Sequence, residues 1–147
     1  MRRPEAGVTL VEMLVVVAIV AIITGISFPA MSSGLESIRL KSAGDSAAAF
    51  LNAATNRVDR RQEALELVLD PQRNELVLLS TEPGFRHTLE FPASIRLLGE
   101  ERRVMLMPGG APPRVTIALS EARGRHKLIR LDPITGVPLV LDEAAGL

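Results

Sequence analysis

The chain has no cysteine, tryptophan or tyrosine and only two histidines among its 147 residues. Without cysteine, the chain has no disulfides and relies on packing alone. Two isolated histidines without cysteine do not make a zinc signature, so no metal site is expected. His87 and His126 do not lie in a G-x-S-x-G elbow, and nucleophilic catalysis has no support. We therefore expect no enzymatic activity and no cofactor.

Charge and aromatic content are also limited. The 17 basic side chains equal the 17 acidic ones, so the formal net charge is zero, and bulk electrostatics imply no polyanionic partner. Four phenylalanines are too few for the stacking platforms that bind single-stranded nucleic acid. Nucleic acid is therefore not an expected partner of the chain as a whole.

One basic cluster near the C-terminus is the exception. It contains Arg123, Arg125, Lys127 and Arg130, which could contact phosphates in a salt-sensitive way. Acidic residues flank the cluster, so a solvated turn is the favoured interpretation and a DNA site the weaker one.

What the sequence does contain is one long apolar stretch, residues 8–28. At about 1.5 Å per residue, a helix of this length can cross a hydrocarbon layer roughly 30 Å thick. Glu12 is its only charged residue, and a carboxylate in lipid costs about 2.5 kcal/mol or more, so it normally has a partner. No basic residue lies between Arg3 and Arg39. The amino group created by a cut after Gly7 would supply a positive charge nearby.

The segment Gly7-Val8-Thr9-Leu10-Val11-Glu12 resembles the type IV prepilin signal of type IV pilins and type II secretion pseudopilins. The resemblance implies that a prepilin peptidase cuts between Gly7 and Val8 and methylates the new terminus at Val8. It also implies that Glu12 neutralises the N-terminus of a neighbouring subunit during filament assembly. Val8 departs from the phenylalanine of most members. Pro29 falls where members often kink the helix, and a kink or short break is expected there.

Two other interpretations of the apolar stretch remain open. A secretory signal peptide could be cut near Ala30-Met31-Ser32, although its apolar core is normally only 7–15 residues. A plain membrane anchor explains the hydrophobicity but gives no reason for Glu12. In each membrane-anchored case, Arg2 and Arg3 keep the N-terminus cytoplasmic by the positive-inside tendency. The rest of the chain would then be periplasmic, with a single pass through the bacterial inner membrane.

The pattern after the apolar stretch predicts an amphipathic helix over residues 30–61. Apolar residues recur at three- and four-residue steps, as expected for one core-facing stripe. The stripe comprises Leu35, Ile38, Ala43, Ala47, Phe50, Leu51, Ala54 and Val58. Gly34 and Gly44 each weaken this helix by up to about 1 kcal/mol.

The remaining sequence alternates short β-rich runs with turn residues. Strands are predicted at 64–69, 75–80, 86–91, 94–98, 103–107, 114–119, 127–131 and 137–141. The expected fold is α+β, with the long N-terminal helix covering an antiparallel sheet or small β-sandwich in a pilin-like arrangement. The predicted segments are a leader (1–7), a transmembrane and assembly helix (8–29), an amphipathic helix (30–61) and a β-rich periplasmic domain (62–147).

The second half is similar to the H-type general secretion pseudopilins and to minor pilins of the FimT kind. The Ala- and Arg-rich helix end and the turn Asp132-Pro133-Ile134-Thr135-Gly136 carry this resemblance. It implies a minor pseudopilin of a type II secretion system. The implied partners are other pseudopilins or pilins, the prepilin peptidase, inner-membrane lipid and the assembly platform of the secretion system. A minor type IV pilin for pilus assembly or DNA uptake, and a membrane-tethered periplasmic binding module, are the alternatives.

Overall fold

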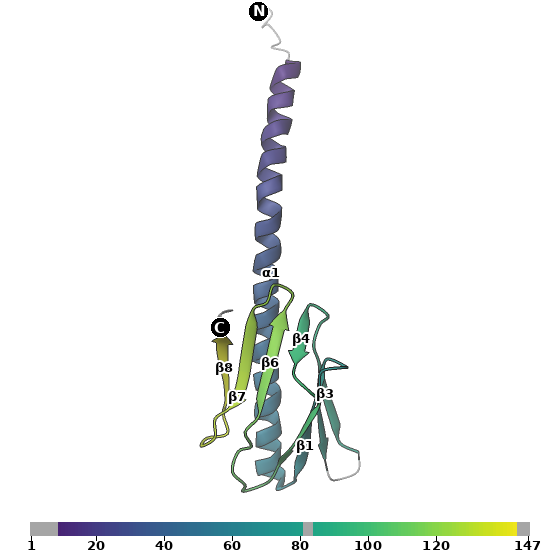
Figure 1. The fold of residues 1–147 in the computed structure, drawn as a ribbon, viewed down its shortest axis with the longest axis vertical. Coiled ribbons are helices and arrows are strands. Elements are labelled where there is room, and N and C mark those ends of the chain that lie inside the picture. Colours follow the sequence, from purple (N-terminus) through teal and green to yellow (C-terminus); the bar gives the residue numbers. More distant parts are fainter. Residues whose placement is uncertain (1–8, 81–83, 144–147) are drawn as a thin grey trace, which may run out of the picture. The chain divides into compact units, whose positions relative to one another are not determined.

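The computed structural model of the chain describes residues 9–80 and 84–143, with the side chains of all of these except 26–33 and 143. The chain divides into two compact units, Met1–Leu35 and Glu36–Leu147. The helix α1 (Leu10–Arg61) contributes residues to both units, and the strands belong to the second (Figure 1). In the described residues the strands are β1 (Leu65–Asp70), β2 (Glu75–Ser80), β3 (Arg86–Glu90), β4 (Ile95–Leu98), β5 (Arg102–Leu106), β6 (Thr116–Glu121), β7 (His126–Leu131) and β8 (Pro138–Glu143).

The start of α1 is fixed by a local cap. The backbone N–H of Glu12 donates to Oγ1 of Thr9 at 3.3 Å, and the N–H of Met13 donates to the Thr9 carbonyl at 3.2 Å. Thr9 is therefore the N-cap residue, whose hydroxyl satisfies a donor that the helix leaves unpaired. Glu12 occupies the third helical position, where glutamate completes the capping-box pattern. The kink predicted at Pro29 stays a prediction, and the helix assignment continues through that residue without a break.

The strands form two separate antiparallel sheets, which confirms the predicted α+β class. Their orders are β3-β2-β1-β5 and β4-β6-β7-β8. The β1–β2, β2–β3, β6–β7 and β7–β8 pairs join strands that are neighbours in sequence. The β1–β5 and β4–β6 pairs join strands that are not consecutive. All eight predicted strands are present, within two residues of the expected bounds.

One core joins the second part of α1 to both sheets. Its helical members are Leu40, Ala43, Ala47, Phe50, Leu51, Ala54 and Val58. Six of the eight predicted stripe residues are confirmed as buried, whereas Leu35 and Ile38 are exposed. The prediction for these two was wrong because, at 3.6 residues per turn, neither lies on the helix face that carries the buried residues, whereas Leu40 does. Leu40 takes their place in the core.

Gly44 is a poor helix former, but its lack of a side chain makes room for Lys127 on β7. Lys127 on β7 is buried, and a Cβ added at Gly44 would overlap its Cδ atom. The helix therefore accepts the cost of glycine at this position because the aliphatic stem of Lys127 lies directly against it.

Asn74 joins the two sheets. It has a positive φ of 57°, a conformation that asparagine tolerates better than most residues. Its Nδ2 donates to the carbonyl oxygens of Phe91 at 3.2 Å and Ile95 at 2.8 Å, and its Oδ1 accepts from the N–H of Leu97 at 2.7 Å. Asn74 lies between β1 and β2 whereas Ile95 and Leu97 lie on β4, so one side chain bonds the backbone across the sheets.

Candidate assembly surface

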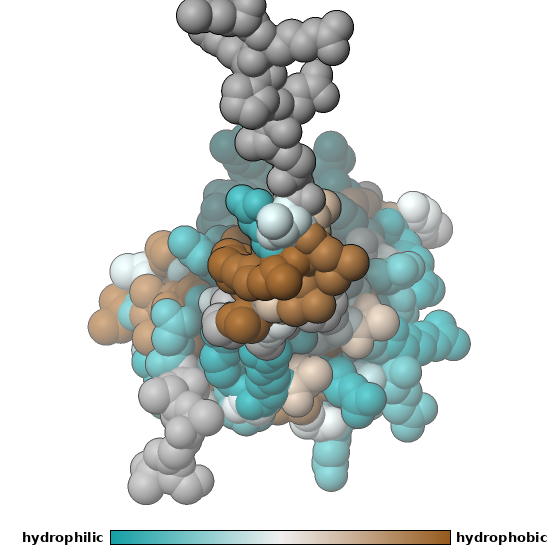
Figure 2. All heavy atoms as spheres, turned by 90° about the horizontal axis from the view of Figure 1, so that it is seen from above, coloured by the Kyte–Doolittle hydropathy of each residue, from teal (hydrophilic) through white to brown (hydrophobic). Residues whose placement is uncertain are grey.

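The first part of α1 exposes apolar side chains on all its faces. From Leu10 to Ile23 the large apolar side chains are between 48% exposed at Val15 and 81% exposed at Leu10. They form the brown cluster at the centre of Figure 2. Soluble monomers rarely expose contiguous apolar surface of this kind, and such surface marks contact with a membrane or another protein.

The polar groups in this segment fit an apolar environment. Oγ1 of Thr24 donates to the carbonyl of Val20 at 2.8 Å, so the hydroxyl is satisfied within the helix. Backbone groups within a helix are likewise bonded internally. Within the part of the chain that the structure describes, no helix combines the length and the apolarity needed to cross a membrane.

Glu12 is the one acidic side chain in the first turn of α1. There its carboxylate faces the positive end of the helix dipole, which favours a negative charge. Among the described residues no salt bridge involves Glu12. Its predicted partner is the terminal amine at Val8 of another subunit. The cleavage residues Gly7 and Val8 lie outside the described residues.

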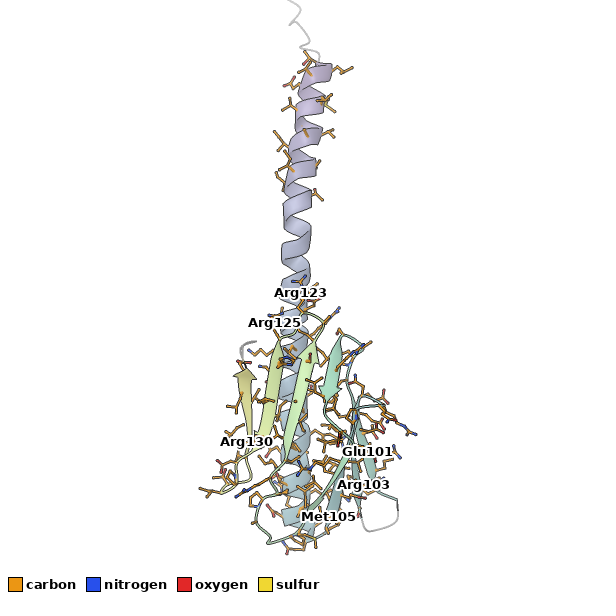
Figure 3. The ribbon with its side chains drawn as sticks, viewed as in Figure 1. Glu101, Arg103, Met105, Arg123, Arg125 and Arg130 are labelled. Atoms are coloured by element: carbon orange, nitrogen blue, oxygen red, sulfur yellow. The ribbon has the colours of Figure 1, made fainter. Side chains whose placement is uncertain are left out.

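The basic cluster proposed from sequence is divided over two ends of β7. Figure 3 shows Arg123 and Arg125 at one end of the strand and Arg130 towards the other. Nε of Arg123 lies 3.1 Å from Oε2 of Glu36 on α1. Arg130 is exposed. The four cations therefore do not form one continuous patch.

Arg125 and Lys127 are paired with carboxylates as well. Arg125 hydrogen-bonds the buried Glu121, and this bond raises the pKa of the Arg125 guanidinium above its ordinary value. Nζ of Lys127 lies 2.6 Å from Oδ1 of Asp142, and that hydrogen bond holds the pKa of Asp142 below its ordinary value. Three of the four predicted DNA-contacting cations thus have carboxylate partners, which reduces the positive charge they offer to phosphates.

The partner carboxylates were the residues that the sequence pattern missed. Glu36 lies on α1, and Glu121 is the last residue of β6. The spacing of Glu121 and Arg125 across a turn is a usable signal for a pair, but nothing in the sequence connects Glu36 to Arg123. Among the described residues, no group of three or more histidine or acidic side chains is placed to hold a metal ion.

Comparison with known proteins gives two matches. Residues 2–28 match the family model described as the prokaryotic N-terminal methylation motif. Over 96 residues the chain is 29% identical to the type II secretion system protein H of Xanthomonas campestris pv. campestris, which is 65% of this chain and 54% of that protein. The chain therefore spans about half the length of the curated relative it matches. No solved structure matches it.

These matches support the predicted resemblance to the type IV pilin and type II secretion pseudopilin superfamily, and within it to the H-type pseudopilins. The methylation motif, residues 2–28, includes Glu12 and the exposed apolar side chains from Leu10 to Ile23.

Proposed function

We propose that this chain is a minor pseudopilin of a type II secretion system, assembling into a short periplasmic pseudopilus for protein export. The observation that carries the proposal is the exposed apolar surface of α1 from Leu10 to Ile23, which lies within the N-terminal methylation motif. Similarity to a protein named for the type II secretion system favours that system. The work of the protein is assembly, and members of this superfamily are structural proteins.

The proposed assembly begins in the inner membrane. The apolar part of α1 holds an unassembled pool there, with residues 8–29 as a single pass and the β-rich part in the periplasm. The prepilin peptidase removes the leader at Gly7 and methylates Val8. The assembly platform then moves the helix from lipid into a bundle of helices from other pseudopilins.

Glu12 guides this transfer in our proposal. An unpaired carboxylate is costly in an apolar bundle, and a charged amine nearby offsets that cost. The amine at Val8 of a neighbouring subunit would supply this charge. The subunit therefore docks most favourably at the axial position where the two groups meet, and the pair acts as a register device.

Intact mass analysis tests the processing step. In cells that contain the prepilin peptidase, the protein is expected to lose the leader, residues 1–7, and to gain one methyl group. A protein that still begins at Met1, or one that begins after Ser32, would overturn the proposal. The same measurement in cells without the peptidase is the control and should give the uncut chain.

Two alternatives differ in their partners. A minor type IV pilin with a role in DNA uptake would bind DNA through Arg123, Arg125, Lys127 and Arg130, and a gel shift at low salt tests it. Binding that is lost in the Arg123→Ala, Arg125→Ala double variant favours that pilin. A membrane-tethered binding module would never assemble. Unchanged secretion after replacement of Glu12 favours the tether.

A further inference from the structure

A basic hollow lies where α1 ends against β2 and β3. Its volume is about 570 Å³. The residues that line it are Ala53, Ala54, Asn56, Arg57, Arg60, Arg61, Leu78, Phe85 and His87. Three of these are arginines and none is acidic, so the wall carries a positive charge in a chain whose net charge is zero.

Arg57 is held in place at this wall. Its Cζ atom lies 3.7 Å from the centroid of the Phe85 ring, a cation–π contact. Its terminal nitrogen lies 3.4 Å from Oε2 of the buried Glu63. Its Nε atom is buried and has no hydrogen-bond acceptor in the described structure. A guanidinium held by these contacts is already ordered and loses little conformational freedom when a ligand binds beside it.

Arg60 and Arg61 add two exposed cations in the last turn of α1. Basic residues there compensate the helix dipole, and this accounts for their charge. It does not account for the hollow that they share with Arg57. Among the described residues no salt bridge involves either arginine, so both guanidinium groups are available to a ligand.

The rest of the wall is apolar. Leu78 and Phe85 face the hollow, together with two alanines of α1. A guanidinium fork matches a carboxylate in two hydrogen bonds, and an apolar wall suits a neighbouring aliphatic side chain. A nucleic acid backbone needs a stripe of cations instead of a single compact hollow.

We infer that this hollow binds an acidic, partly apolar segment of another protein, with a carboxylate placed between Arg57 and the arginine pair at 60 and 61. The site uses only residues of the unit Glu36–Leu147 and none of the processing motif. The inference goes beyond the proposed function, and its test does not depend on whether the N-terminus is cleaved and methylated.

Peptide binding to the full-length chain in detergent micelles tests the inference. The probe is a short fluorescent peptide in which glutamate alternates with leucine, and fluorescence anisotropy at low salt measures its Kd. The Arg60→Gln, Arg61→Gln double variant is expected to weaken binding about tenfold, since each exposed charge pair contributes up to about 1 kcal/mol. Arg57→Gln should weaken binding as well, and because it leaves the buried Glu63 without its partner, its circular dichroism melt is expected to fall.

The controls separate this site from general charge attraction. Arg73→Gln removes an exposed arginine in the turn between β1 and β2, outside the hollow, and should leave the Kd unchanged. A peptide with glutamine in place of glutamate should not bind. Equal binding of that peptide, an equal loss with Arg73→Gln, or no binding of the acidic peptide would each overturn the inference. Binding of a thymidine oligonucleotide, with no binding of the acidic peptide, would also overturn the inference.

Discussion

The two parts of α1 differ in whether their apolar side chains are exposed or buried. In the first part, from Leu10 to Ile23, the large apolar side chains are exposed. In the second part, residues 36–61, apolar residues are fewer, and most of them form one stripe buried against two sheets. Burying a leucine side chain contributes about 1.5–3 kcal/mol. The second part gains this within the chain, whereas the first part leaves its large apolar side chains exposed.

The largest expected effect comes from a substitution in the first part of α1, and it is an effect on assembly. Glu12→Ala should abolish crosslinking of the protein to its filament partners, because the apolar helix loses the charge that selects its docking register. Melting of the β-rich unit should not change. Crosslinking in cells, with the wild-type chain beside the variant, measures the effect.

Two further variants separate the charge of Glu12 from its place in the helix cap. Glu12→Gln keeps a side chain suited to a capping box but removes the charge. Thr9→Ala removes the cap, at a cost of about 1 kcal/mol to the helix, but keeps the charge. Assembly should fail with Glu12→Gln and persist with Thr9→Ala. The reverse result would assign Glu12 to helix capping.

The next largest effect should appear in the core. Leu51→Ala removes a fully buried side chain and should lower the free energy of unfolding by about 2–5 kcal/mol. Leu14→Ala makes the same change at an exposed position and should alter it by less than about 0.5 kcal/mol. Urea denaturation of the full-length chain in detergent measures both. Equal losses would contradict the contrast between the two parts of α1.

Asn74 tests the connection between the sheets. Asn74→Ala loses three hydrogen bonds and places alanine at a positive φ, so we expect a loss of about 2–4 kcal/mol in unfolding free energy. Asn74→Gly removes the same bonds but accepts the backbone conformation, and it should cost less. If both variants unfold like wild type in urea, the side chain does not hold the sheets together.

The smallest effect concerns the turn before β8. Oδ1 of Asp132 accepts from the N–H groups of Thr135 at 2.8 Å and Ile134 at 2.9 Å, and from the Thr135 hydroxyl at 3.0 Å. These bonds, first of all that from the Thr135 backbone, hold the pKa of Asp132 below its ordinary value of 3.8. The ionised Asp132 carboxylate therefore contributes its full stabilisation at any pH above the ordinary pKa. The contribution is lost as the pH falls through the lower pKa of the folded state.

Thermal melts against pH measure this effect. Asp132→Asn keeps the acceptor oxygen and should show a smaller fall in Tm below pH 3.8 than wild type does. Asp132→Ala loses the turn bonds and should melt lower than Asp132→Asn at neutral pH. If Asp132→Asn shows the same fall in Tm at low pH as wild type, the Asp132 carboxylate is not the source of that fall.

Much of the fold is local and could be predicted. The end of α1 at Arg61 and the eight strands follow from periodicity and turn residues, which act over a few positions. The exposure of Leu35 and Ile38 follows from helix geometry, because at 3.6 residues per turn neither lies on the face of the buried Leu40, and the predicted stripe wrongly included them. The pairing of Arg123 with Glu36 could not be predicted, since it joins residues far apart in the chain.

The sequence alone contains the pattern that matches the N-terminal methylation motif. An apolar run with one acid, preceded by Arg2 and Arg3, is a local pattern that requires no folding to be recognised. Only the tertiary structure decided which charges remain available. Folding brought Glu36 of α1, Glu121 of β6 and Asp142 of β8 to three of the basic residues near the C-terminus. The end of α1 left Arg60 and Arg61 beside an open hollow. Charge pairing depends on distances of a few ångströms, and only the folded chain sets those distances.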